Sequence, residues 1–278
     1  MFIISDKKIL CENIIKFDII APDIAKSRAA GQFVLVIPTK ESERVPFTIM
    51  DADINKGVIS IIVQVIGTTT QKLAKLNKND CIYAVAGPLG KQTEIENYGA
   101  AVCIGGGVGT AVMYPIAKEL KKIGNKIISI IGSRNADMLI LEQEMRDISD
   151  EFYITTDDGS KGTKGVVLEP LMNLIKSGKK IDIVFAIGPA IMMMKVSELT
   201  KQYNIKTIVS LNSIMIDGTG MCGSCRVLID GKPKFVCVDG PEFDGHLVDW
   251  QNLMIRQTAF KHQEKCSLDK YLETMNLK

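Results

Sequence analysis

The spacing of hydrophobic residues follows two different patterns along the chain, and the pattern changes near residue 100. Before that point, short runs rich in valine, isoleucine and aromatics alternate with turn residues, as at 32–37, 58–65 and 81–86. Regular short strands of this kind, interrupted by one brief helix near 70–76, are typical of a barrel or sandwich. We therefore predict a β-barrel domain over residues 1–98.

After residue 98 the chain alternates between apolar strands and helices. Strands are expected at 101–104, 126–131, 151–155, 181–187 and 207–211. Between the first two strands, hydrophobic residues recur at helical spacing and so share one helix face; they are Val112, Ile116, Leu120 and Ile123. This alternation predicts a parallel sheet covered by helices, an α/β domain over residues 99–211.

A glycine- and cysteine-rich stretch followed by a polar tail makes up residues 212–278, where we expect a small metal-binding domain. Cys222, Cys225 and Cys237 lie close together, and Asp217 precedes the first of them with four residues between. Plant-type 2Fe–2S ferredoxins space their first three cysteine ligands as C-x4-C-x2-C. The sequence therefore predicts a 2Fe–2S cluster whose first ligand is an aspartate.

Two alternatives remain open for the cysteine cluster. The same four side chains could hold a structural zinc ion, although zinc sites more often use paired C-x2-C motifs or histidines. Cys266 in the tail could replace Asp217 as the fourth ligand. Cys81 and Cys103 lie in apolar strands, where we expect buried thiols that act as small hydrophobic side chains.

A glycine-rich loop follows the first strand of the α/β domain and begins its first helix. It consists of Gly105, Gly106, Gly107, Val108, Gly109 and Thr110. Glycines here let the backbone approach a dinucleotide diphosphate, whose charge is attracted by the positive end of the helix. Later strand ends add candidate walls of the same site, at Asp157, Asp158, Gly188 and Pro189. The loop expected at the ribose offers both Arg134 and Asp137, so NAD and NADP both stay open.

A dinucleotide site and an iron–sulfur cluster in one chain need a chemical intermediary. Nicotinamide transfers two electrons as a hydride, whereas a 2Fe–2S cluster takes one electron at a time, and a flavin bridges the two. Candidate FAD contacts in the β domain are Arg44, Pro46, Phe47 and Thr48. A second group begins the short helix, where backbone amides could hold the FAD diphosphate; it comprises Gly67, Thr68, Thr69 and Thr70.

These motifs, taken in their order along the whole chain, resemble the ferredoxin–NADP reductase superfamily, and especially its branch of electron-transfer subunits that includes that of dihydroorotate dehydrogenase. Within the family, the small subunits of NADH-dependent reduced ferredoxin:NADP oxidoreductases are similar in having aspartate where the first cluster cysteine stands, as at Asp217. The dihydroorotate branch has cysteine at that position. Family usage also favours NAD(H) at the ambiguous ribose loop.

The resemblance implies a flavin-binding β-barrel, an NAD(P)-binding domain and a 2Fe–2S domain. It further implies hydride transfer between NAD(H) and FAD, with single electrons passing through the cluster to a larger flavin and iron–sulfur subunit in a heterodimer. That partner would perform electron bifurcation and react with ferredoxin. No side chain of this chain would act as a catalytic acid or base. The alternatives are an electron-transfer subunit of dihydroorotate dehydrogenase or sulfite reductase, or a zinc-stabilised nucleotide-binding module.

Composition narrows the classes of partner. The chain is 46% hydrophobic and 24% charged, as soluble globular proteins are, and its net charge of +2 gives no basic face for nucleic acid. The longest apolar stretch, 184–194, is interrupted by glycine and proline and is too short to span a membrane. Because no targeting segment is visible and seven cysteines are too few for a disulfide scaffold, we expect a cytoplasmic protein.

Overall fold

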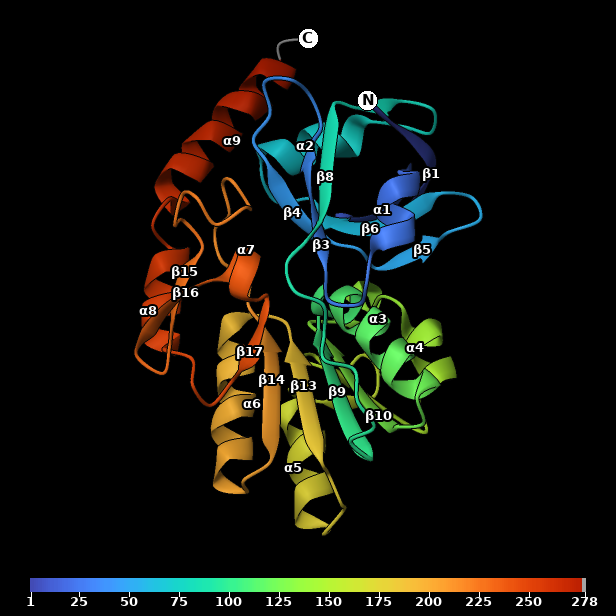
Figure 1. The fold of residues 1–278 in the computed structure, drawn as a ribbon, viewed down its shortest axis with the longest axis vertical. Helices are drawn as coiled ribbons and strands as arrows, with labels where there is room; N and C mark the ends of the chain where they lie inside the picture. Colours follow the sequence, from blue (N-terminus) through green and yellow to red (C-terminus); the bar gives the residue numbers. More distant parts are fainter. Residues whose placement is uncertain (277–278) are drawn as a thin grey trace.

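The computed structural model describes residues 1–276, which form an N-terminal antiparallel β domain, an α/β domain and a small C-terminal region (Figure 1). The β domain has a five-stranded sheet of order β5-β6-β2-β1-β7 and a three-stranded sheet of order β4-β3-β8. Its elements are β1 (Phe2–Cys11), β2 (Ile14–Ile20), α1 (Pro22–Ser27), β3 (Phe33–Ile37), β4 (Val45–Thr48), β5 (Asp51–Asp53), β6 (Val58–Gln64), α2 (Thr68–Lys75), β7 (Cys81–Ile82) and β8 (Ala84–Leu89).

The two sheets of the β domain enclose one core. Alternate residues of a strand point to opposite faces, so Ile59, Ile61 and Val63 of β6 all turn inward and are fully buried. The predicted β domain is confirmed, with two corrections. The strand expected over 81–86 is two strands, interrupted at Tyr83, whose amide instead bonds to Pro38 O at 3.1 Å. The brief helix begins at Thr68 rather than near residue 70.

The α/β domain contains a seven-stranded sheet of order β12-β11-β10-β9-β13-β14-β17. All neighbouring strands are parallel except β17, which runs antiparallel to β14 at the edge. Its elements are β9 (Ala100–Gly106), α3 (Gly109–Lys122), β10 (Lys126–Ser133), the 3-10 helix η1 (Ala136–Met138), α4 (Glu142–Ile148), β11 (Glu151–Thr156), β12 (Thr163–Lys164), α5 (Leu168–Lys176), β13 (Ile183–Ile187), α6 (Ala190–Gln202), β14 (Lys206–Ser210) and, from the C-terminal region, β17 (Glu242–Asp244).

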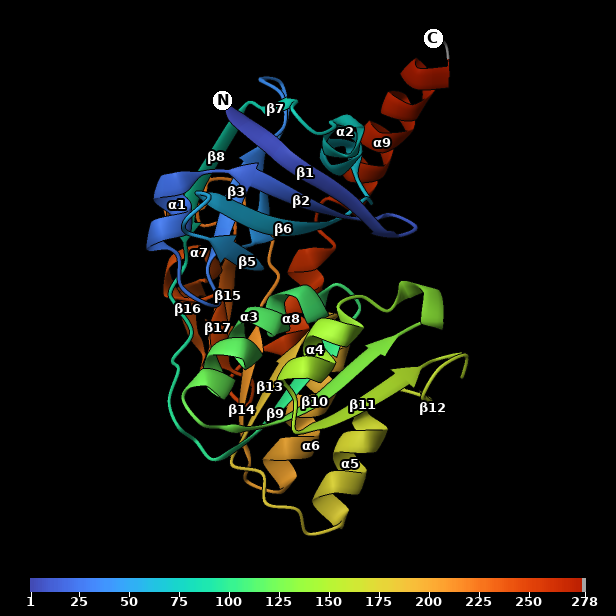
Figure 2. The ribbon, with the colours of Figure 1, turned by 90° about the vertical axis from the view of Figure 1, so that its right-hand side faces the viewer.

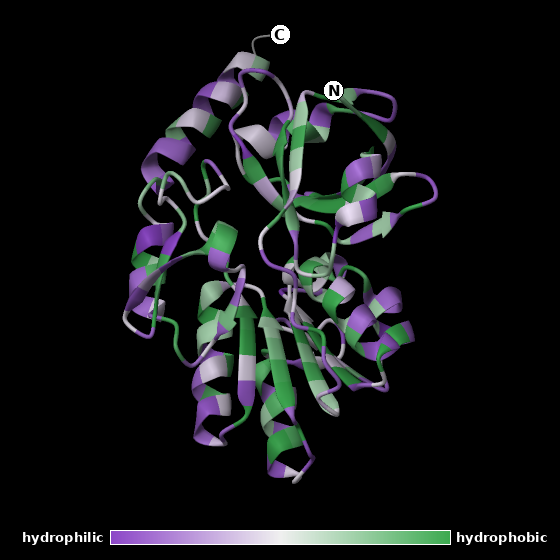
Figure 3. Cartoon of the chain, viewed as in Figure 1, coloured by the Kyte–Doolittle hydropathy of each residue, from purple (hydrophilic) through white to green (hydrophobic). Residues whose placement is uncertain are grey.

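Helices cover both faces of this sheet, as Figure 2 shows. Ala101 and Cys103 of β9 pack in one core cluster with residues of α3 and α4, whereas Val102 and Ile104 pack in another with residues of α5 and α6. A strand buried on both faces reads as a continuous apolar run. Figure 3 shows these strands as hydrophobic and the outer helix faces as largely hydrophilic. The predicted parallel α/β domain is therefore confirmed.

The C-terminal region contains more regular structure than the polar tail suggests. Its elements are β15 (Arg226–Ile229), β16 (Lys232–Phe235), α7 (Val236–Asp239), β17, α8 (Trp250–Gln257) and α9 (Lys261–Asn276). Helix α9 returns to the β domain and packs on α2, where the Thr68 and Ser267 hydroxyls lie 3.2 Å apart (Figure 1). Among residues 1–276, no helix has the length and apolar character to cross a membrane.

The β domain and the α/β domain share a core. Ile14, Met50 and Ile62 of the β domain belong to the same buried cluster as the inner face of α3. One ion pair reinforces the contact, because Asp51 of β5 lies 3.2 Å from the Lys118 ammonium of α3. The two domains are thus held together by packing as well as by charge.

Candidate functional site

The glycine-rich loop lies where the direction of strand addition reverses. The chain adds β10 and β11 on one side of β9 and then returns to add β13 and β14 on the other. Open α/β sheets bind ligands beyond the carboxyl ends of their strands at such a switch point. Gly105 and Gly106 end β9 there, and α3 begins at Gly109.

The same point brings the loop from β13 against the glycine loop. A β-carbon on Gly109 would lie 2.3 Å from Ile187 O, and one on Gly188 would lie 3.1 Å from Gly106 Cα. The glycine loop and the loop at Gly188, which are far apart in sequence, are therefore in backbone contact. Only glycine allows so close an approach. Gly107 differs, because it has a φ of +55° and a β-carbon there would meet no protein atom within 4 Å.

The loop predicted at the ribose meets the loop after β11. The Asp157 and Asp158 amides bond to Ser133 O and Arg134 O at 3.1 and 3.2 Å, so both carboxylates and Arg134 lie at neighbouring strand ends. All three side chains are exposed. Hydrogen bonds from Ser160 lower the pKa of Asp158, which ties that carboxylate to its own turn.

The candidate flavin residues of the β domain lie on an edge strand. Strand β4 holds Pro46, Phe47 and Thr48, and within residues 1–276 it pairs with β3 alone, so its other edge has no strand partner. All four residues of β4 are half-buried, and Arg44 just before it is exposed. An open strand edge beside an exposed cation is suited to a flat, anionic ligand.

The second candidate flavin group lies at the start of α2. Thr70 Oγ1 accepts hydrogen bonds from the amides of Ile66 and Gly67 at 3.0 and 2.9 Å, so its hydroxyl shapes the turn. The first amides of a helix have no partner inside the helix. Those of Thr68 and Thr69 therefore remain as donors, beside Ser267 of α9.

Asp217 and Cys222 form one pair within the cysteine loop. Asp217 Oδ2 accepts from the amides of Thr219 and Met221 at 2.9 and 3.4 Å and from the Thr219 hydroxyl. The Thr219 bonds are the main cause that lowers the pKa of Asp217. Backbone amides, that of Ser224 first and that of Asp217 next, lower the pKa of the exposed Cys222 thiol. Both side chains are thus held in an environment that favours the anion.

Cys225 and Cys237 form a second, buried pair. Their sulfur atoms lie 3.2 Å apart, and the Cys237 amide donates to Cys225 Sγ at 3.5 Å. Burial, with the neighbouring Cys225 sulfur, raises the pKa of Cys237 to about 12. Across residues 1–276, no three His, Cys, Asp or Glu side chains gather as a site for one metal ion. The four side chains thus lie as two pairs.

The other cysteines lie apart from these pairs. Cys266 is exposed on α9, with its sulfur 3.9 Å from the His262 ring nitrogens four residues earlier. Cys103 is fully buried, as predicted, and burial raises its pKa to about 12. The prediction for Cys81 is wrong, because this residue lies on the short strand β7 with its thiol exposed.

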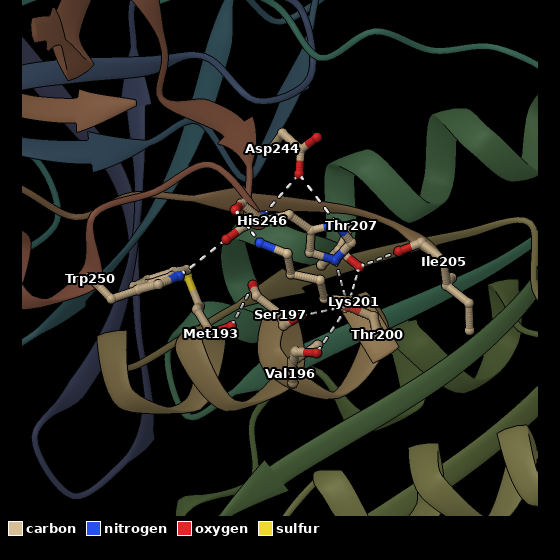
Figure 4. Close-up of polar contacts among 11 residues, drawn as sticks. Met193, Val196, Ser197, Thr200, Lys201, Ile205, Thr207, Asp244, His246 and Trp250 are labelled. Carbon is tan, nitrogen blue, oxygen red and sulfur yellow. Dashed lines mark hydrogen bonds and ion pairs between the residues drawn. The ribbon is translucent and has the colours of Figure 1, made fainter. Parts of the chain in front are cut away.

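Polar contacts anchor the C-terminal region to the α/β domain, as Figure 4 shows. His246 Nε2 lies 3.0 Å from the Thr200 hydroxyl of α6, and the Trp250 indole donates to Gly245 O at 3.1 Å. Both side chains therefore have packing roles. The sequence did not point to Glu242, whose carboxylate accepts from the Thr93 hydroxyl at 2.7 Å and whose pKa burial raises to about 7.

Comparison with known proteins agrees with this arrangement. Residues 212–249 match the family model described as the iron–sulfur cluster binding domain of dihydroorotate dehydrogenase B. A Thermotoga maritima homologue of the dihydroorotate dehydrogenase B (NAD(+)) electron transfer subunit is 44% identical over 95% of this chain and 93% of its own length. The corresponding subunit from Desulforamulus reducens is 31% identical over 83% of this chain and 90% of its own.

Solved structures give the same result. A chain from a study of flavin-based electron bifurcation in NADH-dependent reduced ferredoxin-NADP oxidoreductase is 43% identical, covers 98% of both chains and has a TM-score of 0.93. A ferredoxin NADP+ reductase from Neisseria gonorrhoeae, solved with bound FAD and NADP, is 18% identical over 72% of this chain and 89% of its own, with a TM-score of 0.58, and so shares the fold. The chain therefore belongs to the family of dihydroorotate dehydrogenase B electron-transfer subunits, built on the ferredoxin–NADP reductase fold.

Proposed function

We propose that this chain is an electron-transfer flavoprotein subunit that connects NAD(H), through FAD and a 2Fe–2S cluster, to a larger flavin and iron–sulfur subunit. The observation that carries the proposal is the contact between the cysteine loop and the sheet that carries the candidate flavin residues. A β-carbon on Gly218 would lie 2.5 Å from Leu35 Cδ1, and Leu35 pairs with Pro46 across β3 and β4. A nucleotide-binding module without redox activity would not need this contact.

The residues present fit each group. The open edge of β4 and the free amides of α2 suit a flavin and its diphosphate. The space over Gly107, which has no protein atom within 4 Å of a β-carbon, suits a dinucleotide diphosphate at the switch point. Asp217, Cys222, Cys225 and Cys237 supply one carboxylate and three sulfurs in two pairs, a donor set that two irons accept.

The work of the protein in this reaction is orientation. FAD held here would supply the exchange between the two-electron hydride of NADH and the single electrons that a 2Fe–2S cluster carries. The glycine loop and Gly188 would hold the dinucleotide, and β4 and α2 would hold the flavin. The buried pair Cys225 and Cys237 would shield its part of the cluster from water. No acid or base is required, because positioning two rings against each other supplies the catalysis.

Relatives suggest which complex the subunit joins. We propose a partner like that in NADH-dependent reduced ferredoxin:NADP oxidoreductase, with electron bifurcation in the larger subunit, because a chain 43% identical to this one comes from a structure of that enzyme. The alternative is a dihydroorotate dehydrogenase complex, whose electron transfer subunits include a relative 31% identical to this chain. The identity of the large subunit that purifies with the chain distinguishes them. A flavin and iron–sulfur protein that reacts with ferredoxin is expected, and one that oxidises dihydroorotate would support the alternative.

The ligand set is tested by substitution in the anaerobically purified chain. Cys225→Ser should lose the iron and sulfide of the cluster, while Cys266→Ser, the matched control on α9, keeps both. Asp217→Cys should keep the cluster but change its electron paramagnetic resonance spectrum and reduction potential, because thiolate is a softer ligand than carboxylate. If Asp217→Ala leaves spectrum and potential unchanged and Cys266→Ser loses iron, the fourth ligand is Cys266.

A further inference from the structure

An ion pair joins the candidate flavin residues to the cysteine loop. Arg44 Nη1 lies 3.6 Å from Asp217 Oδ1, across 173 positions of sequence. Both side chains keep access to solvent, with 50% of the Arg44 side chain and 24% of the Asp217 side chain exposed. The two residues were predicted to serve different cofactors, so their contact connects two sites.

The two oxygens of Asp217 have different partners. Oδ2 accepts the hydrogen bonds from Thr219 and Met221 and so holds the carboxylate within its own loop. Oδ1 is left to face Arg44. The next residue, Gly218, has a φ of +81°, which favours glycine, and packs so closely on Leu35 of β3 that a β-carbon would lie 2.5 Å from Leu35 Cδ1. The loop is therefore held on the β domain at two successive residues, once by charge and once by packing.

Arg44 has more N–H donors than its contact with Asp217 uses. A guanidinium has five N–H donors and stays charged at any pH that a folded protein tolerates. Apart from the contact with Asp217, the part of the chain that the structure describes provides Arg44 with no other ion pair or side-chain hydrogen bond. Arg44 directly precedes β4, whose outer edge has no strand partner in the part of the chain that the structure describes.

We propose that Arg44 is a positioning residue for the iron–sulfur cluster as well as a flavin contact. Through Asp217 it fixes the cysteine loop on β4 and keeps a permanent positive charge beside the first ligand. This inference rests on the proposed function, because it requires the cluster at Asp217. A nearby positive charge favours the reduced cluster, which has one more negative charge, so Arg44 raises the reduction potential of the cluster.

The test compares Arg44→Gln, which removes the charge, with Arg44→Lys, which keeps it, in the full chain purified anaerobically. The cluster potential is measured by a mediated redox titration followed by electron paramagnetic resonance, which does not depend on flavin. We expect Arg44→Gln to keep iron and sulfide, to change the spectrum of the reduced cluster and to shift its reduction equilibrium about fivefold toward the oxidised form. At about 59 mV per tenfold for one electron, this is roughly 40 mV. Arg44→Lys should keep the reduction potential close to that of the unmodified chain, because lysine retains the positive charge.

Controls separate this inference from the proposed function. Arg146→Gln breaks a surface ion pair with Glu142, whose atoms lie 3.2 Å apart in α4, and should leave spectrum and potential unchanged. If Arg44→Gln loses flavin while the cluster spectrum and potential stay as in the unmodified chain, Arg44 serves the flavin alone and the inference is wrong. An unmodified chain without iron would instead contradict the proposed function itself.

Discussion

The carboxyl group of Glu242 is held away from water where three segments of the chain meet. Glu242 of β17 bonds to Thr93, in the connection between the domains, and a β-carbon on Gly31 of the β domain would lie 2.8 Å from its Oε1. Burial, the main cause, raises its pKa from 4.5 to about 7, and Glu94 adds to the effect. No cation pairs with Glu242 among residues 1–276.

Glu242 should therefore make the stability of the chain depend on pH. The folded state binds the proton more tightly than the unfolded state, so the stability from this group is present below pH 4.5 and is lost as pH rises through about 7. Relative to the unmodified chain, Glu242→Gln should gain about 2–3 kcal/mol in its free energy of unfolding between pH 5 and pH 8. Urea unfolding at the two pH values measures this. Glu198→Gln, an exposed control paired with Lys195, should show no such difference, and an equal gain at both pH values for Glu242→Gln would contradict the account.

Two glycines allow a matched test of the dinucleotide site. Gly107 in the glycine loop and Gly178 after α5 have φ values of +55° and +73°, and a β-carbon at either would meet nothing within 4 Å. Alanine at either position should thus lower the free energy of unfolding by about 1–2 kcal/mol through backbone strain. Only Gly107→Ala should also weaken NADH binding, by about tenfold or more, because its methyl group enters the space left for the diphosphate. Isothermal titration with NADH checks this, and equal affinity in both variants would place the site elsewhere.

Single residues show how far sequence alone could reach. The cysteine spacing and the glycine loop are local patterns, so the kind of ligand that each would bind can be predicted before the fold is known. The pairing of Arg44 with Asp217 and the burial of Glu242 depend on how distant segments meet, and no periodicity records such contacts.

Strands and helices were predictable where one face or both faces are buried. The strands of the central sheet are continuous apolar runs, which is why their positions were close to those observed. Helix α9 was missed because most of its side chains are exposed, so its sequence shows little apolar periodicity. The split at Tyr83 was missed because a strand can change partners without a change in composition.

One aromatic ring contributes to the docking of α9 on α2, in addition to the contact between Thr68 and Ser267. Tyr271 lies with its ring centroid 4.9 Å from the Lys75 ammonium and 6.0 Å from that of Lys72. Removing the ring in Tyr271→Ala should cost about 0.5–1 kcal/mol of this contact and so raise hydrogen exchange in α9 by about two- to fivefold. Tyr203→Ala, at an exposed tyrosine after α6, is the control. Unchanged exchange in α9 of the Tyr271 variant would mean that other contacts hold the helix.

The proposed path between the cofactor sites does not follow the order of the regions along the chain, because the β domain comes first in the sequence and the α/β domain second. The α/β domain with its switch point packs on the β domain through α3, and the cysteine loop packs on the β domain through Gly218. The β domain, with the candidate flavin residues, therefore contacts both the α/β domain and the cysteine loop. Such an arrangement suits a path from a two-electron donor to a one-electron acceptor.

The most direct test of this path is an anaerobic titration of the purified chain with NADH, followed by absorbance and electron paramagnetic resonance. We expect about one FAD, two irons and two sulfides per chain. We also expect NADH to bleach the flavin absorbance and to produce the signal of a reduced 2Fe–2S cluster. A colourless chain that contains zinc, or a flavin and cluster that NADH leaves oxidised, would contradict the account.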